Sequence, residues 1–358
     1  MFKHLSRLFV VASLTMPYLL CAAPARAQAI PAQIDTYMRG LYRQKKFNGV
    51  VLVADKGNII YEKSFGFAQY QPRTPLTNDS LFNLASVSKE FTAMAIMMLK
   101  EQGRLQYDDD VRKYVPELPY SDITIRQLLH HTSGLPDYIE LADKNWDSDK
   151  IMTNKDVLAI LKQYKPAPLF KPGEKYEYSN TGYQLLASVV ERVSGKRFPK
   201  FMHDAIFAPL GMTSTVVYTA AAMKPFAARR AYGYDPKGRG YELDDMGYLD
   251  GIWGDGGIYS TVDDLLRWDQ ALYGKTLVSR KTLLEAFTPG RLNSGKKTDY
   301  GFGWNIEEDS VWHDGSWVGF RTFIDRFLQS RKTIIILTNT SCENLGDIDR
   351  KITAILGE

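Results

Sequence analysis

The sequence predicts a mixed fold, in which an antiparallel α/β sheet lobe flanked by helices carries an inserted all-α lobe. Strand-forming runs gather at the two ends of the chain. Near the start, Val50–Ala54 and Ile59–Lys63 surround the turn sequence Asp55–Asn58, which is typical of a β-hairpin. Strand character returns only near the C-terminal end. The stretch between them, residues 106 to about 273, has helical periodicity and many loop residues.

The individual elements follow the same division. The expected helices are Ala32–Gln44, a helix from Ser86 to about Gly103, Thr124–His130, Lys155–Tyr164, Thr181–Ser194, Asp263–Leu272 and about Gly346–Ile355. The expected late strands are Gly303–Glu307, Ser310–His313, Val318–Asp325 and Thr333–Thr338. We therefore expect one domain over residues 28–358, with the sheet lobe at about 28–80 and 300–358 and the helical lobe at about 104–273. The helix that starts at Ser86 would lie at the junction of the lobes, where ligand clefts commonly form.

The first 27 residues are predicted to be a cleaved export signal. Basic residues precede an apolar run from Leu8 to Ala23, and Ala25–Ala27 supplies a small-x-small cleavage site. Cleavage after Ala27 is expected, with Ala29 as the neighbouring option. A membrane anchor is the alternative, but Pro17 and the shortness of the run argue against it. We expect the mature protein to be periplasmic or secreted, without a stable membrane span.

Removal of this leader changes the charge and the cysteine content. The full chain has 45 basic and 41 acidic residues. The leader holds Lys3, Arg7 and Arg26 and no acid, so 42 basic residues and a net charge of +1 remain. The sequence contains no run of basic residues, so it gives no indication of a nucleic-acid partner. Only Cys342 remains after loss of Cys21, so no internal disulfide is possible. No metal-binding, cofactor or phosphate-loop pattern is present, and no cofactor is expected.

A candidate nucleophile lies in the segment Phe82–Leu99. Ser86 begins an apolar helical pattern and Lys89 follows three residues later, on the same helical face. A partly desolvated lysine can take the proton of a serine hydroxyl, and a helix start offers N–H groups for an oxyanion. Ser86 as a simple N-cap is the alternative. A second Ser-x-x-Lys, Ser294–Lys297, lies in a polar loop pattern without helical context.

Two further motifs place polar residues where a predicted helix begins or a predicted strand ends. Tyr178 and Asn180 form the only Tyr-x-Asn of the chain and directly precede a helical pattern. Tyr178 could hold a proton between nucleophile and leaving group if a nearby cation lowered its pKa, and Asn180 could contact a substrate carbonyl. The segment His313–Ser316 (His-Asp-Gly-Ser) ends a strand-like run, and its glycine permits close approach of a substrate backbone. Taken singly, each motif is equally consistent with a structural role.

The three motifs, in this order, resemble those of the serine β-lactamase and penicillin-binding protein superfamily. The similarity is greatest to the class C β-lactamase-related branch, which includes D,D-peptidases, D-amino-acid peptidases and esterases. It covers about Phe47 to Thr338. Beyond the motifs, it includes the segments Leu128–Leu135, Tyr178–Tyr183 and Gly254–Thr261. The resemblance implies a β-lactamase/transpeptidase-like fold, and it favours Ser86 over Ser294 as the nucleophile.

The resemblance also implies a role for each motif residue. Ser86 would be the acylated nucleophile, Lys89 its proton partner, and Tyr178 the general base and acid. The substrate-binding residues would be Asn180, His313, Asp314, Gly315 and Ser316, with the N–H groups of Ser86 and Ser316 forming the oxyanion hole.

Two residues depart from the pattern of family β-lactamases. His313 stands where they carry lysine, and Asp314 stands where a Thr or Ser helps to hold a substrate carboxylate. If Asp314 faces the cleft, its charge should repel such a carboxylate. If Asp314 points away from the cleft, or pairs with a base such as Arg321, it should not repel a substrate carboxylate.

Three functions remain open from the sequence. The first is an exported serine hydrolase that acylates Ser86 with an uncharged ester or amide. The second is a D,D-carboxypeptidase or weak β-lactamase that reads a carboxylate. The third is a non-catalytic, penicillin-binding-like protein, against which the intact Ser86, Lys89 and Tyr178 argue. The expected partner is a small ester, amide or peptide.

Overall fold

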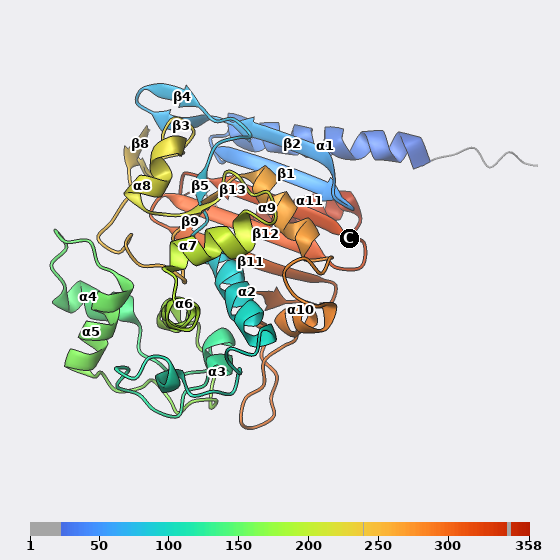
Figure 1. Cartoon of the computed structure of the whole chain (residues 1–358). Helices are drawn as coiled ribbons and strands as arrows, with labels where there is room; N and C mark the ends of the chain where they lie inside the picture. The colour runs from blue at the N-terminus through green and yellow to red at the C-terminus, as the bar shows by residue number, and fades with distance from the viewer. Residues whose placement is uncertain (1–22, 239, 342–344) are drawn as a thin grey trace, which may run out of the picture.

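The computed structural model describes residues 23–238, 240–341 and 345–358, with side chains from residue 29 onward. The predicted cleavage site falls at this boundary: Ala25 and Ala27 lie within the first helix, and leader residues 1–22 are outside the described part. The expected strand-rich ends and helical middle are both present (Figure 1).

A six-stranded antiparallel sheet organises the fold. Its order is β10-β11-β12-β13-β1-β2, so the C-terminal strands continue directly into the N-terminal hairpin. The strands of the protein are β1 (Gly49–Asp55), β2 (Asn58–Phe65), β3 (Phe67–Tyr70), β4 (Arg73–Pro75), β5 (Phe82–Asn83), β6 (Val216–Val217), β7 (Tyr234–Lys237), β8 (Gly240–Leu243), β9 (Ile258–Ser260), β10 (Asn305–Ile306), β11 (Ser310–Trp317), β12 (Phe320–Phe327) and β13 (Lys332–Thr338).

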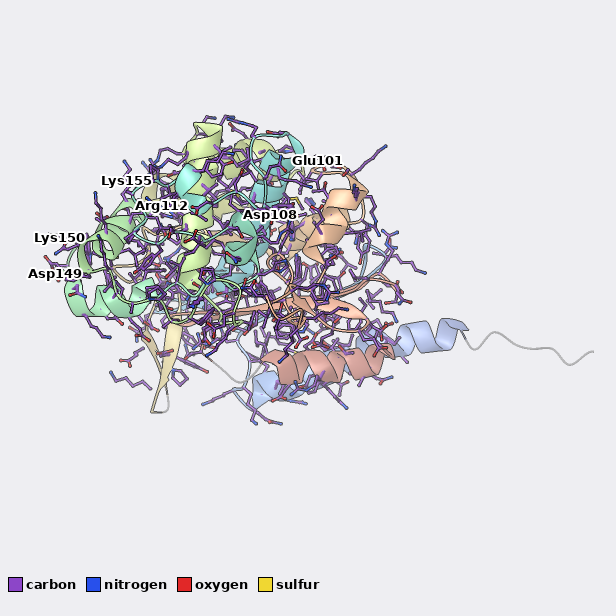
Figure 2. All side chains as sticks on the ribbon, turned by 90° about the horizontal axis from the view of Figure 1, so that it is seen from below. Glu101, Asp108, Arg112, Asp149, Lys150 and Lys155 are labelled. Atoms are coloured by element: carbon purple, nitrogen blue, oxygen red, sulfur yellow. The ribbon has the colours of Figure 1, made fainter. Side chains whose placement is uncertain are left out.

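Both faces of this sheet are buried, which explains its continuous apolar strands. In β1, Val51 and Val53 face one core cluster while Val50 and Leu52 face the other. This division follows from the alternation of side chains along a strand. The cluster that contains Val51 lies under helices α1 (Ala23–Arg43) and α11 (Leu345–Leu356). Figure 2 shows these two helices side by side on the outer face.

The remaining α-helices lie in the middle of the chain, some on the inner face of the sheet and others in a lobe away from it (Figure 1). They are α2 (Ser88–Glu101), α3 (Ile125–Leu129), α4 (Tyr138–Asn145), α5 (Asn154–Tyr164), α6 (Asn180–Ser194), α7 (Phe198–Met202), α8 (Ala220–Met223), α9 (Val262–Ala271) and α10 (Arg280–Ala286). Helix α2 is buried almost all round, because it packs against α6 of the helical lobe as well as contacting α10. Charged residues such as Asp108, Asp149 and Lys155 cover the outside of the helical lobe (Figure 2).

The structure differs from the sequence prediction in the middle of the chain. The predicted helical lobe also contains the short strands β6 to β9, and β9 pairs with β5 and β6 in a small sheet. Helix α9, expected in the helical lobe, instead packs on β1 and β13. Strands of two or three residues, such as β6 and β9, are too short to produce a periodic pattern that distinguishes them from loops.

A buried ion pair attaches α9 to the sheet. Arg326 on β12 donates to Asp269 on α9 at 2.5 Å, and both side chains are fully buried. The same guanidinium also donates to the Asp269 backbone oxygen at 3.1 Å. A charge left unpaired in this interior would be costly, because both side chains are fully buried.

We therefore predict that Asp269→Ala lowers the free energy of unfolding by about 3–5 kcal/mol, the range for breaking a buried pair. Chemical denaturation with urea measures it. The double variant Asp269→Leu/Arg326→Met, which removes both charges, should recover much of the loss. If the single variant unfolds at the same urea concentration as the wild type, the pair does not hold α9 in place.

Candidate active site

The nucleophile candidate lies on a strained turn rather than at the first residue of a regular helix. Ser86 occupies the 3₁₀ turn Ala85–Val87, and α2 begins two residues later at Ser88. Ala85 has φ +48°, a conformation that costs a non-glycine residue about 1 kcal/mol or more. Its N–H donates to Asn83 Oδ1 at 2.9 Å, which fixes the turn. Ser86 carries no N-capping hydrogen bond for α2, so the N-cap alternative does not explain it.

Strand β11 presses against this turn through Gly315. A Cβ atom at position 315 would lie 2.3 Å from the Leu84 backbone oxygen and 2.3 Å from Thr322 Oγ1. The Thr322 hydroxyl donates to the same Leu84 oxygen at 2.7 Å. The glycine of the His-Asp-Gly-Ser motif is therefore needed for contact between β11 and the nucleophile turn, in addition to any contact with substrate.

Lys89 lies next to Ser86 and is completely buried. Its Nζ atom donates to Ser86 Oγ at 3.0 Å, to Asn180 Oδ1 at 2.9 Å and to the Asp255 backbone oxygen at 2.7 Å. Burial lowers the pKa of Lys89 to about 8, although the nearby Asp255, Asp137 and Asp314 carboxyls act in the opposite direction. At neutral pH roughly a tenth of the lysine is therefore unprotonated and able to accept the serine proton.

Tyr178 completes this group. Lys89 Nζ lies 4.8 Å from the centre of its ring. Although 37% of Tyr178 is exposed, its hydroxyl points inward and forms a hydrogen bond with Ser86. Burial raises the pKa of Tyr178 well above 10, and the Ser86 hydrogen bond only partly opposes this. The sequence made the role of Tyr178 in proton transfer conditional on a nearby cation that lowers its pKa. The structure does not meet that condition, because desolvation raises this pKa. Tyr178 thus keeps its proton at neutral pH and suits the role of proton donor.

Asn180 is the first residue of α6 and lines the cavity into which Ser86 opens. Because its Oδ1 accepts from Lys89, its amide nitrogen is the group available for a substrate carbonyl. Ser179, the N-cap, accepts from Gly182 N–H at 3.1 Å and fixes the helix start.

His313 is buried and fully hydrogen-bonded. Its Nε2 pairs with Tyr300 Oη at 2.9 Å and its Nδ1 with the Asp314 backbone oxygen at 2.6 Å. Burial, with a smaller contribution from the charge of Lys89, lowers the pKa of His313 to about 3. The histidine is therefore neutral and does not replace the cationic lysine of family β-lactamases. It holds the strand and Tyr300, whereas the sequence suggested that it contacts substrate.

Asp314 points away from the Ser86 cavity. In β11 it pairs with Phe323, which belongs to the core cluster under α1 and α11, whereas His313 pairs with Ile324 of the inner core. Its side chain lines a separate cavity on that outer face. The condition under which Asp314 would repel a substrate carboxylate is thus not met.

The cavity beside Ser86 has a volume of about 190 Å³ and an acidic, partly aromatic lining. Asp250, Asp255, Tyr138 and Trp317 belong to it, and Ser316 lies at its edge. Tyr138 Oη donates to Asp255 Oδ2 at 2.8 Å and Trp317 Nε1 donates to Asp250 Oδ1 at 2.9 Å. No arginine, lysine or histidine is among the described residues that line it.

Sequence reasoning did not assign these four residues. Asp255 lies in the segment Gly254–Thr261, which contributed to the resemblance but received no role. Tyr138, Asp250 and Trp317 stand outside any motif and could be found only from the folded chain. The competing Ser294 is exposed on a loop, where its hydroxyl contacts only the backbone of that loop.

These features define a class of protein: a serine hydrolase in which a buried lysine and a tyrosine form hydrogen bonds with a serine just before a helix. Over the described ranges, no cluster of His, Cys, Asp or Glu could hold a metal ion. The same ranges contain no helix with the length and apolar character needed to cross a bilayer.

Comparison with known proteins places the chain within that class. Residues 34–356 match the family described as Beta-lactamase, and the chain belongs to this family. It is 43% identical to "Penicillin-binding protein 4*" of Bacillus subtilis over 86% of this chain and 71% of the relative. It is 31% identical to the putative penicillin-binding protein PbpX of the same organism, over 87% and 76% of the two chains. The structure of an octameric penicillin-binding protein homologue from Pyrococcus abyssi superposes with a TM-score of 0.78 at 26% identity, over 91% of this chain and 77% of that one. The predicted superfamily and the predicted fold are both confirmed.

The contact at Gly315 gives a first prediction for the site. Gly315→Ala should lower kcat/KM by about 10²-fold or more, because the added methyl group must move β11 or the nucleophile turn. Steady-state ester hydrolysis measures this. Gly240→Ala is the matched control, because the nearest atom to its added carbon is 3.9 Å away. Equal activity of the two variants would show that the Gly315 contact does not position Ser86.

The lysine gives a second prediction. If neutral Lys89 accepts the Ser86 proton, kcat/KM should rise about tenfold per pH unit below pH 7 and level off above pH 8, following the pKa of about 8. Asp255→Asn removes the nearest charge that favours the ammonium, so the rising limb should move to lower pH. A pH–rate profile of both proteins tests this. A limb that stays in place, or moves upward, would remove Lys89 from the role of base.

Proposed function

We propose that this chain is an exported serine hydrolase that forms an acyl-enzyme on Ser86 from a small ester or amide without a carboxylate near the scissile bond. The observation that carries the proposal is the 3.0 Å contact between Ser86 Oγ and the buried Lys89 Nζ. A serine hydroxyl that faces solvent has no base, whereas this one meets an amine whose pKa lies near neutrality.

The chemistry follows from the order of proton affinities. Neutral Lys89 takes the Ser86 proton as Oγ attacks the acyl carbon, and Tyr178 donates a proton to the leaving group because its own pKa stays high. The N–H groups of Ser86 and Ser316 are the proposed donors to the oxyanion. A water molecule then attacks the acyl-enzyme and gives its proton to the Tyr178 phenolate, and Lys89 returns its proton to Ser86 Oγ as the acyl–oxygen bond breaks.

The charge of the cavity supports the choice of substrate class. Asp250 and Asp255 both line it, and no basic side chain of the described residues does so. A substrate carboxylate at about 4 Å from one ionised aspartate would be disfavoured by about 1–4 kcal/mol between the limits of bulk water and the protein surface. Apolar and aromatic groups fit beside Ile139, Leu249 and Trp317.

A second candidate is a D,D-carboxypeptidase or weak β-lactamase. One observation favours it: the 43% identical relative carries the name of a penicillin-binding protein. Penicillins bear a carboxylate, so this candidate and the first make opposite predictions about charge. Export through the leader, to the periplasm or medium, is part of both proposals.

Intact-mass spectrometry of the purified protein tests them. After a neutral p-nitrophenyl ester or benzylpenicillin is added, we expect an acyl adduct on wild-type protein and none on Ser86→Ala. Ser294→Ala, the matched control, should acylate normally. We expect the neutral ester to acylate at least tenfold faster than the penicillin. An adduct that persists in Ser86→Ala overturns the site, and faster acylation by penicillin would favour the second candidate.

A further inference from the structure

A second cavity lies on the outer face of β11 and β12, beside the start of α11. Its volume is about 460 Å³, and we call it the back cavity. Four carboxyl side chains line it, those of Glu307, Asp314, Asp325 and Asp349. It is separate from the Ser86 cavity except at Ser316, which lines both.

Two of these carboxyls are buried without full compensation. Asp325 is 5% exposed and Asp349 is 7% exposed, and each has an Oδ1 atom without a hydrogen-bond partner among the described residues. A buried carboxylate oxygen that lacks a donor costs free energy, because it has lost water and gained nothing in return.

The basic residues of the back cavity do not satisfy these acids. Arg321 donates to the backbone oxygens of Val318 and Phe320, both at 2.7 Å. Arg350 pairs with Asp347 on the surface of α11. Among the described residues, no ion pair joins any of the four carboxyls to a base. The back cavity therefore holds four carboxyls and two arginines, Arg321 and Arg350, and neither arginine forms an ion pair with these carboxyls.

The spacing of the acids indicates the kind of cation. Among the described residues they do not form a cluster of three that could hold a metal ion. They are instead spread around a volume much larger than one ion. The indole of Trp312 and the ring of Phe323, stacked 5.4 Å apart, supply an aromatic wall, which is a favourable neighbour for an alkylammonium group.

We propose that the back cavity binds an organic ammonium ion, best matched by a diamine whose two charged ends reach separate carboxyls. An amine bound in the back cavity would change the position of Ser86 in the active site. Gly315 and Ser316 line the back cavity, and Gly315 touches the turn that carries Ser86. A bound amine would thus contact the strand that positions the nucleophile.

Binding should depend on pH in a defined direction. Burial raises the pKa of Asp325 to about 7 and that of Asp349 to about 8. The groups that face these two carboxyls are each other, Glu307, Ser310, Arg326 and Arg350. An ammonium ion attracts the ionised forms, so its affinity should rise between pH 6 and pH 8.5, over which alkylamines stay protonated.

The test uses the full mature chain with 1,4-diaminobutane as the probe. At pH 8.5 we expect calorimetric binding and a Tm increase above that produced by NaCl at equal ionic strength. Asp349→Asn, and independently the more exposed Asp314→Asn, should weaken binding at least tenfold. Glu308→Gln, a neighbouring acid outside the back cavity, is the matched control and should bind as the wild type does.

Two outcomes would overturn the proposal: no binding beyond the NaCl effect, or the same affinity in Asp314→Asn, Asp349→Asn and Glu308→Gln. Measuring binding in Ser86→Ala as well separates this question from catalysis, because that variant should bind the diamine even if Ser86 is not the nucleophile.

The amine that occupies the back cavity is either a free effector or a group of the substrate. A free effector would change kcat/KM for a neutral ester, whereas a substrate-borne amine would lower KM for an ester with a distal amine, in the wild type but not in Asp349→Asn.

Discussion

The burial of the Lys89 amine is the constraint on which the site depends. An ammonium group without water must find acceptors within the protein. Here it finds them on three different segments: Ser86 beside its own helix, Asn180 at the start of α6, and the backbone of Asp255 before β9. Burial of the ammonium group costs free energy, but it also lowers the pKa of Lys89 toward neutrality. A fraction of the lysine is therefore neutral and can act as a base. The site can form only when both lobes are packed together.

A second constraint is the contact between β11 and the nucleophile turn. The turn is strained at Ala85, and strain of this kind persists only where the surroundings hold it. Gly315 and Thr322 supply that support through Leu84, while Asn83 fixes the amide of Ala85. Ser86 is thus positioned by strand β11 of the sheet as much as by its own helix.

Electrostatics around the site are dominated by desolvation. Burial keeps Tyr178 protonated, and burial together with the charge of Lys89 keeps His313 neutral. The only strong fixed charges that line the Ser86 cavity, among the described residues, are carboxyls. A site of this composition differs from one that holds a substrate carboxylate with a basic residue. The carboxyls that line the Ser86 cavity are those of Asp250 and Asp255, whereas Asp314 lines the back cavity and acts on the site through its charge near Lys89.

The sequence by itself determined the division into strand-rich ends and a helical middle, because apolar periodicity is local and survives in long elements such as β1, β13 and α6. It also pointed to Ser86, Lys89, Tyr178 and Asn180 as candidate site residues, because their motifs resemble those of a known family. Only the tertiary structure decided the rest. The short strands β6 and β9 and the docking of α9 on the sheet depend on partners far away in the chain. The direction of the Tyr178 pKa depends on burial, which no motif encodes. Whether Asp314 faces the nucleophile or the opposite side depends on the register of β11 against β12, and a shift of one residue would exchange the two faces.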